Sequence, residues 1–462
     1  MIEKIVSLVQ SIEIESKGEV TLARALAYEL KTHYHAVVCQ GALYLYEGGI
    51  FHQVSRDALM SAVQAFNGLT YLEEDKTKAL VLRHATVTGI CNALLVCREL
   101  LDDEFFDVVP NGVCFNDSFL AIREGKLAVL QHSPEHKATM KIEQALPSEP
   151  QSIVPASFLA FLDELFQGDP DAREKVLLLR QYIGVCLAGA ATEMQRALLL
   201  YGAGGNGKSV LLDIISSCFD PKTVVSSSPS RWGEEYYVAM LHPFKARLNV
   251  CSELPEQSKG SRSETFKQII SGDFVTGREA YGKPQSFRPR CGHIFAANSL
   301  PSSVSGDYSH GFFRRWIILE LKREFTKDGS RRSSKEIRES MEAERAAIIV
   351  WCLRSIGQVL KTGEYTLPES SKSVFSQWKE ETNPVADFIA SCAEISESYE
   401  KFSYVYDEFV DWVQASGRNR MSKIAFGRRL RECEIKIKRE STGRAVALKM
   451  KPRTEWLDFT HH

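Results

Sequence analysis

The sequence predicts an α/β protein with a phosphate-binding loop (P-loop) core, a mixed α/β segment before the core and a winged-helix-like segment after it. Short apolar runs alternate with helical stretches between residues 191 and 330, which is typical of a parallel sheet covered by helices. A glycine-rich loop directly follows the first run, residues 197–201. Near the C-terminus, two helical stretches precede two strand-like ones, which is the order of a winged helix.

Composition limits the class of protein. The chain has 462 residues and a formal net charge of −2, which indicates roughly two to four domains and excludes a uniformly basic nucleic-acid coat. Eleven scattered cysteines without a CxxC pair predict reduced, mostly buried thiols and no zinc ribbon. Because neither a signal peptide nor a membrane-length apolar run is present, we expect no membrane partner and a location in the cytoplasm of a bacterial cell or host.

Residues 1–150 are predicted to form one N-terminal α/β domain. Its expected elements are a helix, two strands joined by a hairpin turn, and a second helix with Asp57 as its N-cap. The predicted helices and strands are, in order, residues 21–32, 42–46, 50–54 and 57–66. A proline-rich linker at 147–155 leads to two amphipathic helices, residues 158–166 and 172–186, within a helical lead-in at 156–190.

Apolar runs and helical patterns also predict the elements of the core at 191–330 and of the segments after it. Buried strands are expected at 197–201, 248–251, 292–297 and 316–321. A helical segment at 331–380 begins with one long helix, residues 335–360. The winged-helix-like domain at 385–455 is expected to contain helices at 404–415 and 423–432, and strands at 435–439 and 445–450.

The glycine-rich loop matches the pattern G-x4-G-K-S in full. In such a loop, backbone N–H groups and a helix N-terminus surround phosphates, Lys208 reaches the β- and γ-phosphates, and Ser209 ligates Mg²⁺. The alternative, a chance glycine-rich loop, does not explain the strand before it and the helix after it. The predicted nucleotide-binding residues are Gly202, Gly204, Gly205, Asn206, Gly207, Lys208, Ser209 and Val210.

Polar residues follow two further core strands. Glu253 follows the strand at 248–251 and is the candidate base and Mg²⁺ ligand, with Glu256 as a second choice. Asn298 follows the strand at 292–297, where an amide can sense the γ-phosphate. The alternatives are an acid at an exposed strand end and an ordinary turn-forming asparagine.

Basic residues mark two more candidate sites. Arg314 and Arg315 precede the last core strand, from which an arginine can reach a neighbouring subunit's phosphates. Residues 275–290 predict a hairpin with Arg278, Tyr281 and Lys283 near its tip, which combines charge with an aromatic ring for nucleic-acid contact. Without the other motifs, both features would be interpreted as solvated surface.

The C-terminal segment is locally basic. Three glutamates, Glu432, Glu434 and Glu440, oppose a larger set of cations. This excess on a winged-helix pattern indicates duplex or fork DNA, although a basic face that docks on protein remains the alternative. The cations are Arg418, Arg420, Lys423, Arg428, Arg429, Arg431, Lys436, Lys438, Arg439, Arg444, Lys449 and Lys451.

As a set, these motifs resemble the superfamily 3 helicases, in particular the phage and plasmid primase-associated branch that includes the poxvirus primase-helicase. The matching stretches are 200–209, 249–256, 266–273, 295–301 and 313–316. Residues 111–113 and 132–135 look like the branch's N-terminal helicase-associated domain, and 158–184 look like its helical lead-in. The resemblance covers most of the chain.

The resemblance implies an AAA+ core in a hexameric ring that uses ATP and Mg²⁺ to move 3′→5′ along single-stranded DNA during phage or mobile-element replication. It makes Lys208, Glu253, Asn298 and Arg315 catalytic, with Ser209 and Glu253 on the metal, and it places the hairpin in the pore. Ser252 stands where many relatives have a second acid. The implied partners are single-stranded and forked DNA, further copies of this chain, and a separate primase or polymerase.

Two other functions fit the motifs. An AAA+ ATPase that remodels protein would not respond to DNA. An origin-binding protein that uses ATP only for assembly would not separate strands. DNA-stimulated hydrolysis tests the first alternative, and strand displacement on a fork tests the second.

Overall fold

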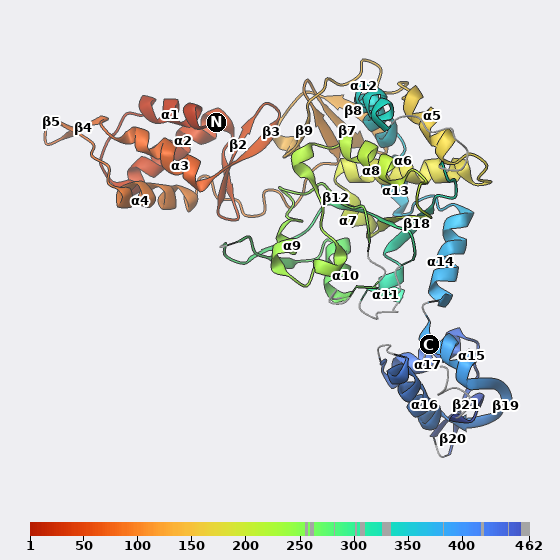
Figure 1. Ribbon diagram of the computed structural model, residues 1–462. Helices are drawn as coiled ribbons and strands as arrows, with labels where there is room; N and C mark the ends of the chain where they lie inside the picture. The colour runs from red at the N-terminus through yellow and green to blue at the C-terminus, as the bar shows by residue number, and fades with distance from the viewer. Residues whose placement is uncertain are drawn as a thin grey trace.

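The computed structural model describes most of the chain. The described residues are 1–254, 257–258, 263–280, 282–300, 303–304, 310–325, 334–381, 383–416, 420–441 and 443–453. Helices and several sheets are mixed (Figure 1), and the largest sheet among the described residues is wholly parallel.

The parallel sheet has five strands in the order β11-β12-β16-β10-β18. Every neighbouring pair is parallel, and Leu199 of β10 lies opposite Phe295 on one side and Ile318 on the other. Because parallel strands end at a common edge, the segments after β10, β12 and β16 emerge close together. The strands are β10 (Ala197–Tyr201), β11 (Val224–Val225), β12 (Leu248–Cys251), β16 (Gly292–Ala297) and β18 (Trp316–Glu320).

Helices cover both faces of this sheet, because successive side chains of each strand point to opposite sides. Leu198 and Leu200 pack with helices on one face, whereas Ala197 and Leu199 pack with those on the other. The first face holds α5 (Ala156–Leu165), α6 (Ala172–Ala188), α8 (Lys208–Ser217) and α12 (Ser334–Leu353). The second holds α9 (Glu235–Ala239), α10 (Ser263–Ser271), α11 (His310–Phe313) and α14 (Glu369–Glu381).

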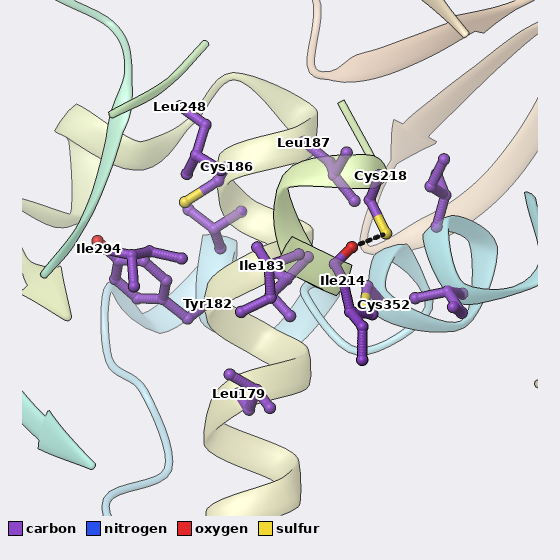
Figure 2. Packing of buried hydrophobic residues seen from close by; sticks show 14 of the residues in the cluster. Leu179, Tyr182, Ile183, Cys186, Leu187, Ile214, Cys218, Leu248, Ile294 and Cys352 are labelled. Atoms are coloured by element: carbon purple, nitrogen blue, oxygen red, sulfur yellow. Dashed lines mark hydrogen bonds between the residues drawn. The ribbon is translucent and has the colours of Figure 1, made fainter. Parts of the chain in front are cut away.

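The first face contains the largest apolar cluster. Figure 2 shows Tyr182 and Cys186 of α6 beside Leu248 of β12 and Ile294 of β16, with Ile214 of α8 close by. The Tyr182 hydroxyl donates to the backbone oxygen of His293 at 2.7 Å. Burial raises the pKa of this hydroxyl well above its usual value. The lead-in helix α6 is therefore an integral part of the core.

The N-terminal residues are divided among several apolar clusters, of which the two largest are separate from each other. One cluster lies among four helices and three strands, and a hairpin lies beside them. The helices are α1 (Ile2–Ser11), α2 (Glu19–Tyr34), α3 (Arg56–Val63) and α4 (His84–Leu95). The strands are β1 (Val37–Cys39), β2 (Ala42–Glu47) and β3 (Ile50–Val54), and the hairpin consists of β4 (Thr70–Glu73) and β5 (Lys76–Ala79). By contrast, Val113, Phe115 and Leu120 join the central cluster. They belong to the sheet of β6 (Gly112–Phe115), β7 (Phe119–Arg123), β8 (Lys126–Leu130) and β9 (Lys141–Ile142).

The C-terminal residues form their own core, which α14 joins to the rest of the chain (Figure 1). Three strands lie in the order β19-β21-β20. The predicted helices and strand pair are present, but a helix and a long strand precede them. The elements are α15 (Pro384–Cys392), β19 (Ala393–Lys401), α16 (Phe402–Ala415), α17 (Lys423–Glu432), β20 (Ile437–Glu440) and β21 (Gly443–Met450).

Two predicted helices differ in detail. The N-cap of α3 is Ser55 instead of Asp57, because the Ser55 hydroxyl accepts from the backbone N–H of Ala58. The helix predicted at 335–360 is divided into α12 and α13 (Gly357–Thr362). At this break, the backbone of Gly357 lies close to that of Gly125, where a β-carbon would not fit.

All eleven cysteines are free thiols, and ten of them are buried, as the sequence predicts. None of the helices in the described ranges is long and apolar enough to cross a membrane.

Candidate functional site

A cavity of about 500 Å³ opens at the edge where β10, β12 and β16 end. We call it the P-loop pocket. Ser252 and Glu253 after β12 and Asn298 after β16 line it together with the glycine-rich loop. Its lining residues are Phe161, Glu164, Gly204, Gly205, Asn206, Gly207, Lys208, Ser209, Val210, Ser252, Glu253, Ala296, Ala297, Asn298, Phe325 and Ile337.

Lys208 is the buried cation of this pocket. Its Nζ donates to the backbone oxygens of Gly202 (2.6 Å) and Ala203 (2.8 Å) and to Oδ1 of Asn206 (3.0 Å). Burial lowers the pKa of the ammonium group, because a low-dielectric surrounding disfavours its charge. No carboxylate forms an ion pair with Lys208 in the part of the chain that the structure describes. An anion in the pocket would offset this desolvation.

The loop shape depends on close backbone packing. A β-carbon on Gly202 would lie 2.2 Å from the backbone oxygen of Leu321 and 2.4 Å from Nδ2 of Asn206. Asn206 Nδ2 donates to that Leu321 oxygen at 3.0 Å. Gly205 and Gly207 have φ of +77° and +84°, which glycine adopts without steric cost. The loop is therefore tied to the residue after β18.

The end of β18 is tied in turn to α6. Lys175 is fully buried, and its Nζ donates to Asp169 at 2.8 Å and to the backbone oxygen of Glu320 at 2.9 Å. A buried ion pair of this kind fixes the positions of its two segments, because loss of one partner would leave the other charge buried and unpaired. The lead-in helix thus fixes the strand end that holds the P-loop.

Glu253 and Asn298 extend from the sheet edge with their side chains exposed. The backbone N–H of Leu254 donates to the oxygen of Ala296 at 2.8 Å, which keeps the two strand ends together. Both residues line the P-loop pocket, as does Ser252. The structure thus brings Lys208, Ser209, Glu253 and Asn298 into one cavity. The second-choice acid, Glu256, lies outside the described residues.

Four lining residues were not identified from the sequence. Phe161 and Glu164 come from α5, Ile337 comes from α12, and Phe325 lies after β18. The backbone N–H of Phe325 donates to the oxygen of Gly205 at 3.0 Å. The amphipathic pattern predicted the lead-in helix, but it could not show which residue faces a loop forty positions further along the chain.

Arg315 lies away from the P-loop pocket. It is 7% exposed and donates to Ser271 Oγ from Nη2 at 2.7 Å, to the backbone oxygen of Lys267 from Nε at 3.2 Å, and to that of Gly311. Arg314 is exposed instead, and its Nη2 donates to Gln195 Oε1 at 3.2 Å. Of the two adjacent arginines, Arg315 packs inside this chain and Arg314 faces outward.

The predicted hairpin is present as β14 (Val275–Gly277) and β15 (Gln285–Phe287), which pair antiparallel. Its base packs tightly on α9, where a β-carbon on Gly277 would lie 2.6 Å from the backbone nitrogen of Ala239. Arg278 is paired with Glu235 at 3.4 Å. Lys283 is exposed and has no ion-pair partner in the described ranges. Tyr281 lies outside the described residues.

No cluster of three or more histidine, cysteine or acidic side chains suited to a metal ion occurs among the described residues. Mg²⁺ in a P-loop needs fewer protein ligands, because phosphates and water supply the rest. The side-chain oxygens that line the pocket include the Ser209 hydroxyl and the Glu253 carboxylate. This hard-oxygen set fits Mg²⁺.

Residues 200–315, less than half of the chain, match a family of unknown function, DUF5906. No curated protein matches the chain. The fold is similar to the apo structure of the NrS-1 C-terminal region, with a TM-score of 0.43 and 11% identity over 94% of this chain and 100% of that one. Two A form apo structures of that region give TM-scores of 0.41 (11% identity, 91% and 98% covered) and 0.39 (10% identity, 90% and 96% covered). Likenesses this distant support no inference about activity.

Proposed function

We propose that this chain is an ATP-driven DNA helicase motor with an AAA+ core of the superfamily 3 type, which acts as a ring in phage or mobile-element replication. The observation that carries the proposal is the P-loop pocket. It gathers Lys208 and Ser209 from the loop, Glu253 from β12 and Asn298 from β16. These are the residue types that phosphoryl transfer from a nucleotide requires.

Each side chain has a role in hydrolysis. Lys208 exchanges its neutral carbonyl partners for phosphate oxygens, which gives stronger, charge-assisted hydrogen bonds. Ser209 and Glu253 would hold Mg²⁺, which would neutralise charge on the phosphates. The Glu253 carboxylate also accepts a proton from the attacking water, and the Asn298 amide orients that water or the γ-phosphate.

The strand order supports the AAA+ assignment. Strand β16 lies between β10 and β12, so Asn298 extends from the sheet edge between the loop and Glu253. The lead-in helix α5 and the later helix α12 close the pocket with Phe161 and Ile337. Their apolar side chains suit the base and sugar of a nucleotide, whereas the loop suits its phosphates.

Two regions support DNA as the substrate. Lys283 on the β14–β15 hairpin, which has no ion-pair partner among the described residues, offers a cation for the phosphates of a strand in the pore. The C-terminal elements run helix, strand, two helices and two strands, which is a winged-helix arrangement. On α17, Ile424, Arg428 and Arg431 are exposed at positions that share one helical face. This face suits duplex or fork DNA.

The arginine pair supports a ring. We assign contact with the neighbouring subunit's nucleotide to the exposed Arg314, and we assign to Arg315 the positioning of the segment through Ser271 and Gly311. This division modifies the role that the resemblance implies for Arg315.

The proposal is tested by ATP hydrolysis measured with and without single-stranded DNA, together with unwinding of a forked duplex that carries a 3′ tail. We expect DNA to stimulate hydrolysis and the fork to be unwound only with ATP and Mg²⁺. Hydrolysis that ignores DNA would favour a protein-remodelling ATPase. Fork binding without strand separation would favour an origin-binding protein.

A further inference from the structure

A second cavity, of about 380 Å³, lies where the N-terminal residues meet the core beside the base of the hairpin. We call it the arginine cavity. Arg247 precedes β12, Arg288 and Arg290 follow β15, and Lys137 comes from the segment before β9. Four cations from three separate segments therefore line one cavity.

None of these cations forms an ion pair in the part of the chain that the structure describes. Arg247 donates only from Nε, to the sulfur of Met140 at 3.1 Å. Arg290 donates to the backbone oxygen of Asp107, and Arg288 Nη1 donates to that of Gly272 at 3.3 Å. The Lys137 ammonium lies 4.7 Å from the centre of the Phe105 ring. Their remaining donors are available to a ligand.

The grouping is electrostatically unfavourable without an anion. Burial, with the charge of Arg290 nearby, lowers the pKa of Arg247 to about 10. Two acids, Asp107 and Glu193, also line the cavity, and their charges favour the charged form of Arg290 but are not among those that act on Arg247. Burial raises the pKa of Glu193, so its charge is itself disfavoured. An anionic ligand would relieve the repulsion between the arginines and offset their desolvation.

An exposed aromatic ring stands among these cations. Phe274 is 60% exposed, and the Arg288 guanidinium lies 4.1 Å from its ring centre. Phe244 and Phe106 also line the cavity, with their ring centres 4.8 Å apart. Cationic side chains beside open aromatic faces are the combination that holds phosphate and base of a nucleotide together.

We propose that the arginine cavity binds the phosphates of single-stranded polynucleotide, with a base stacked on Phe274, outside the pore hairpin. The choice of a polynucleotide rests on the proposed function, whereas the phosphate chemistry rests on the cavity itself. The hairpin begins directly after Phe274 and ends directly before Arg288. A strand held here would therefore be guided to or from the hairpin.

The test is binding of fluorescent oligo-deoxythymidine, without ATP, at several salt concentrations. Arg247→Gln and Arg288→Gln are compared with Arg83→Gln, which removes the same charge from an exposed position outside the cavity. We expect each cavity variant to weaken binding about tenfold, the effect of losing one hydrogen bond to a charged group. The log–log salt slope should fall by about one unit for each lost phosphate contact. Arg83→Gln should bind as wild type does.

Equal affinity of all three variants and wild type would overturn the proposal. Deoxythymidine monophosphate binding that depends on Arg247 and Arg288, with unchanged oligonucleotide affinity, would overturn the assignment to a strand in favour of a free nucleotide. Failure of the helicase proposal looks different. Wild type would then bind oligonucleotide through these arginines without DNA-stimulated hydrolysis or unwinding.

A second measurement uses the unaltered protein, so that misfolded variants cannot decide the result. Ultraviolet crosslinking to 5-bromodeoxyuridine-substituted single strands, followed by mass spectrometry, should place a crosslink on the peptide that contains Phe274. Phe274→Leu should remove that crosslink and leave the thermal unfolding midpoint near that of wild type, because this ring is mostly exposed. Crosslinks confined to the C-terminal residues would contradict the proposal.

Discussion

The two cavities differ in whether their cations already have hydrogen-bond partners that balance their charge. In the P-loop pocket, Lys208 is satisfied by three oxygens of its own loop. In the arginine cavity, burial and the nearby charge of Arg290 lower the pKa of Arg247, which forms no ion pair in the described ranges. A ligand of the first must displace existing hydrogen bonds, whereas a ligand of the second relieves existing repulsion. In the motor that we propose, the first cavity would suit a ligand that is exchanged in every cycle, and the second would suit one that is held through many cycles.

The largest test of this difference is Lys208→Ala. ATP hydrolysis should fall by about 10³ or more, the scale on which one transition-state cation contributes to phosphoryl transfer. Oligonucleotide binding at the arginine cavity without ATP should persist, because no residue lines both cavities. The measurements are steady-state phosphate release and fluorescence anisotropy on the same protein. Turnover near that of wild type would remove the P-loop assignment.

The arginine pair tests whether the P-loop pocket is complete within one chain. Arg314→Ala should reduce hydrolysis by about 10³ with little change in thermal stability, since an exposed side chain is lost. Arg315→Ala should instead lower the unfolding midpoint, because Ser271 and Gly311 lose a buried donor. Mixing Arg314→Ala with Lys208→Ala subunits should restore some activity, as some interfaces then hold an intact loop and an intact arginine. Restoration by Arg315→Ala alone would reverse the two roles.

The hairpin variant is expected to have the smallest effect on ATP hydrolysis. Lys283→Ala should weaken single-stranded DNA binding about tenfold and abolish unwinding, because a phosphate contact is lost from every subunit of the ring. Hydrolysis without DNA should remain close to wild type, since Lys283 lies outside the P-loop pocket. Forked-duplex unwinding and DNA-free hydrolysis measure the two effects. If hydrolysis falls as well, the hairpin supports the core and does not grip DNA.

Elements formed by neighbouring residues were predictable from the sequence, and so was the one grouping of distant residues that a parallel sheet implies. The arginine cavity was not predictable. The strands at 197–201, 248–251 and 292–297 appear with the predicted bounds, because apolar runs and glycine loops are local signals. The grouping of Lys208, Glu253 and Asn298 followed from parallel strands sharing an edge. The arginine cavity draws on segments more than one hundred positions apart, and nothing local to Lys137 or Arg247 indicates that they meet.

The same reason explains the remaining differences. Whether Arg314 or Arg315 is buried depends on how α10 packs against the turn before β18. The two arginines are adjacent in the sequence, so their local sequence environment does not distinguish them. Likewise, the sheet of β6–β9 shares its core with α6, although the proline-rich linker at 147–155 lies between them in the chain. The proline-rich linker therefore does not mark a boundary between two hydrophobic cores.

In the ring that we propose, strand β18 would link the arginine pair of one subunit to that subunit's phosphate loop. At its beginning, Arg315 is anchored to α10, and at its end the oxygens of Glu320 and Leu321 hold Lys175 and Asn206. An extended strand barely stretches along its axis, so it acts as a stiff rod between these two ends. A push on the arginine side would reach the amide that restrains Lys208. Contact of a neighbouring subunit with the arginines would then shift the phosphate loop of the subunit that carries them, through movement of β18 alone.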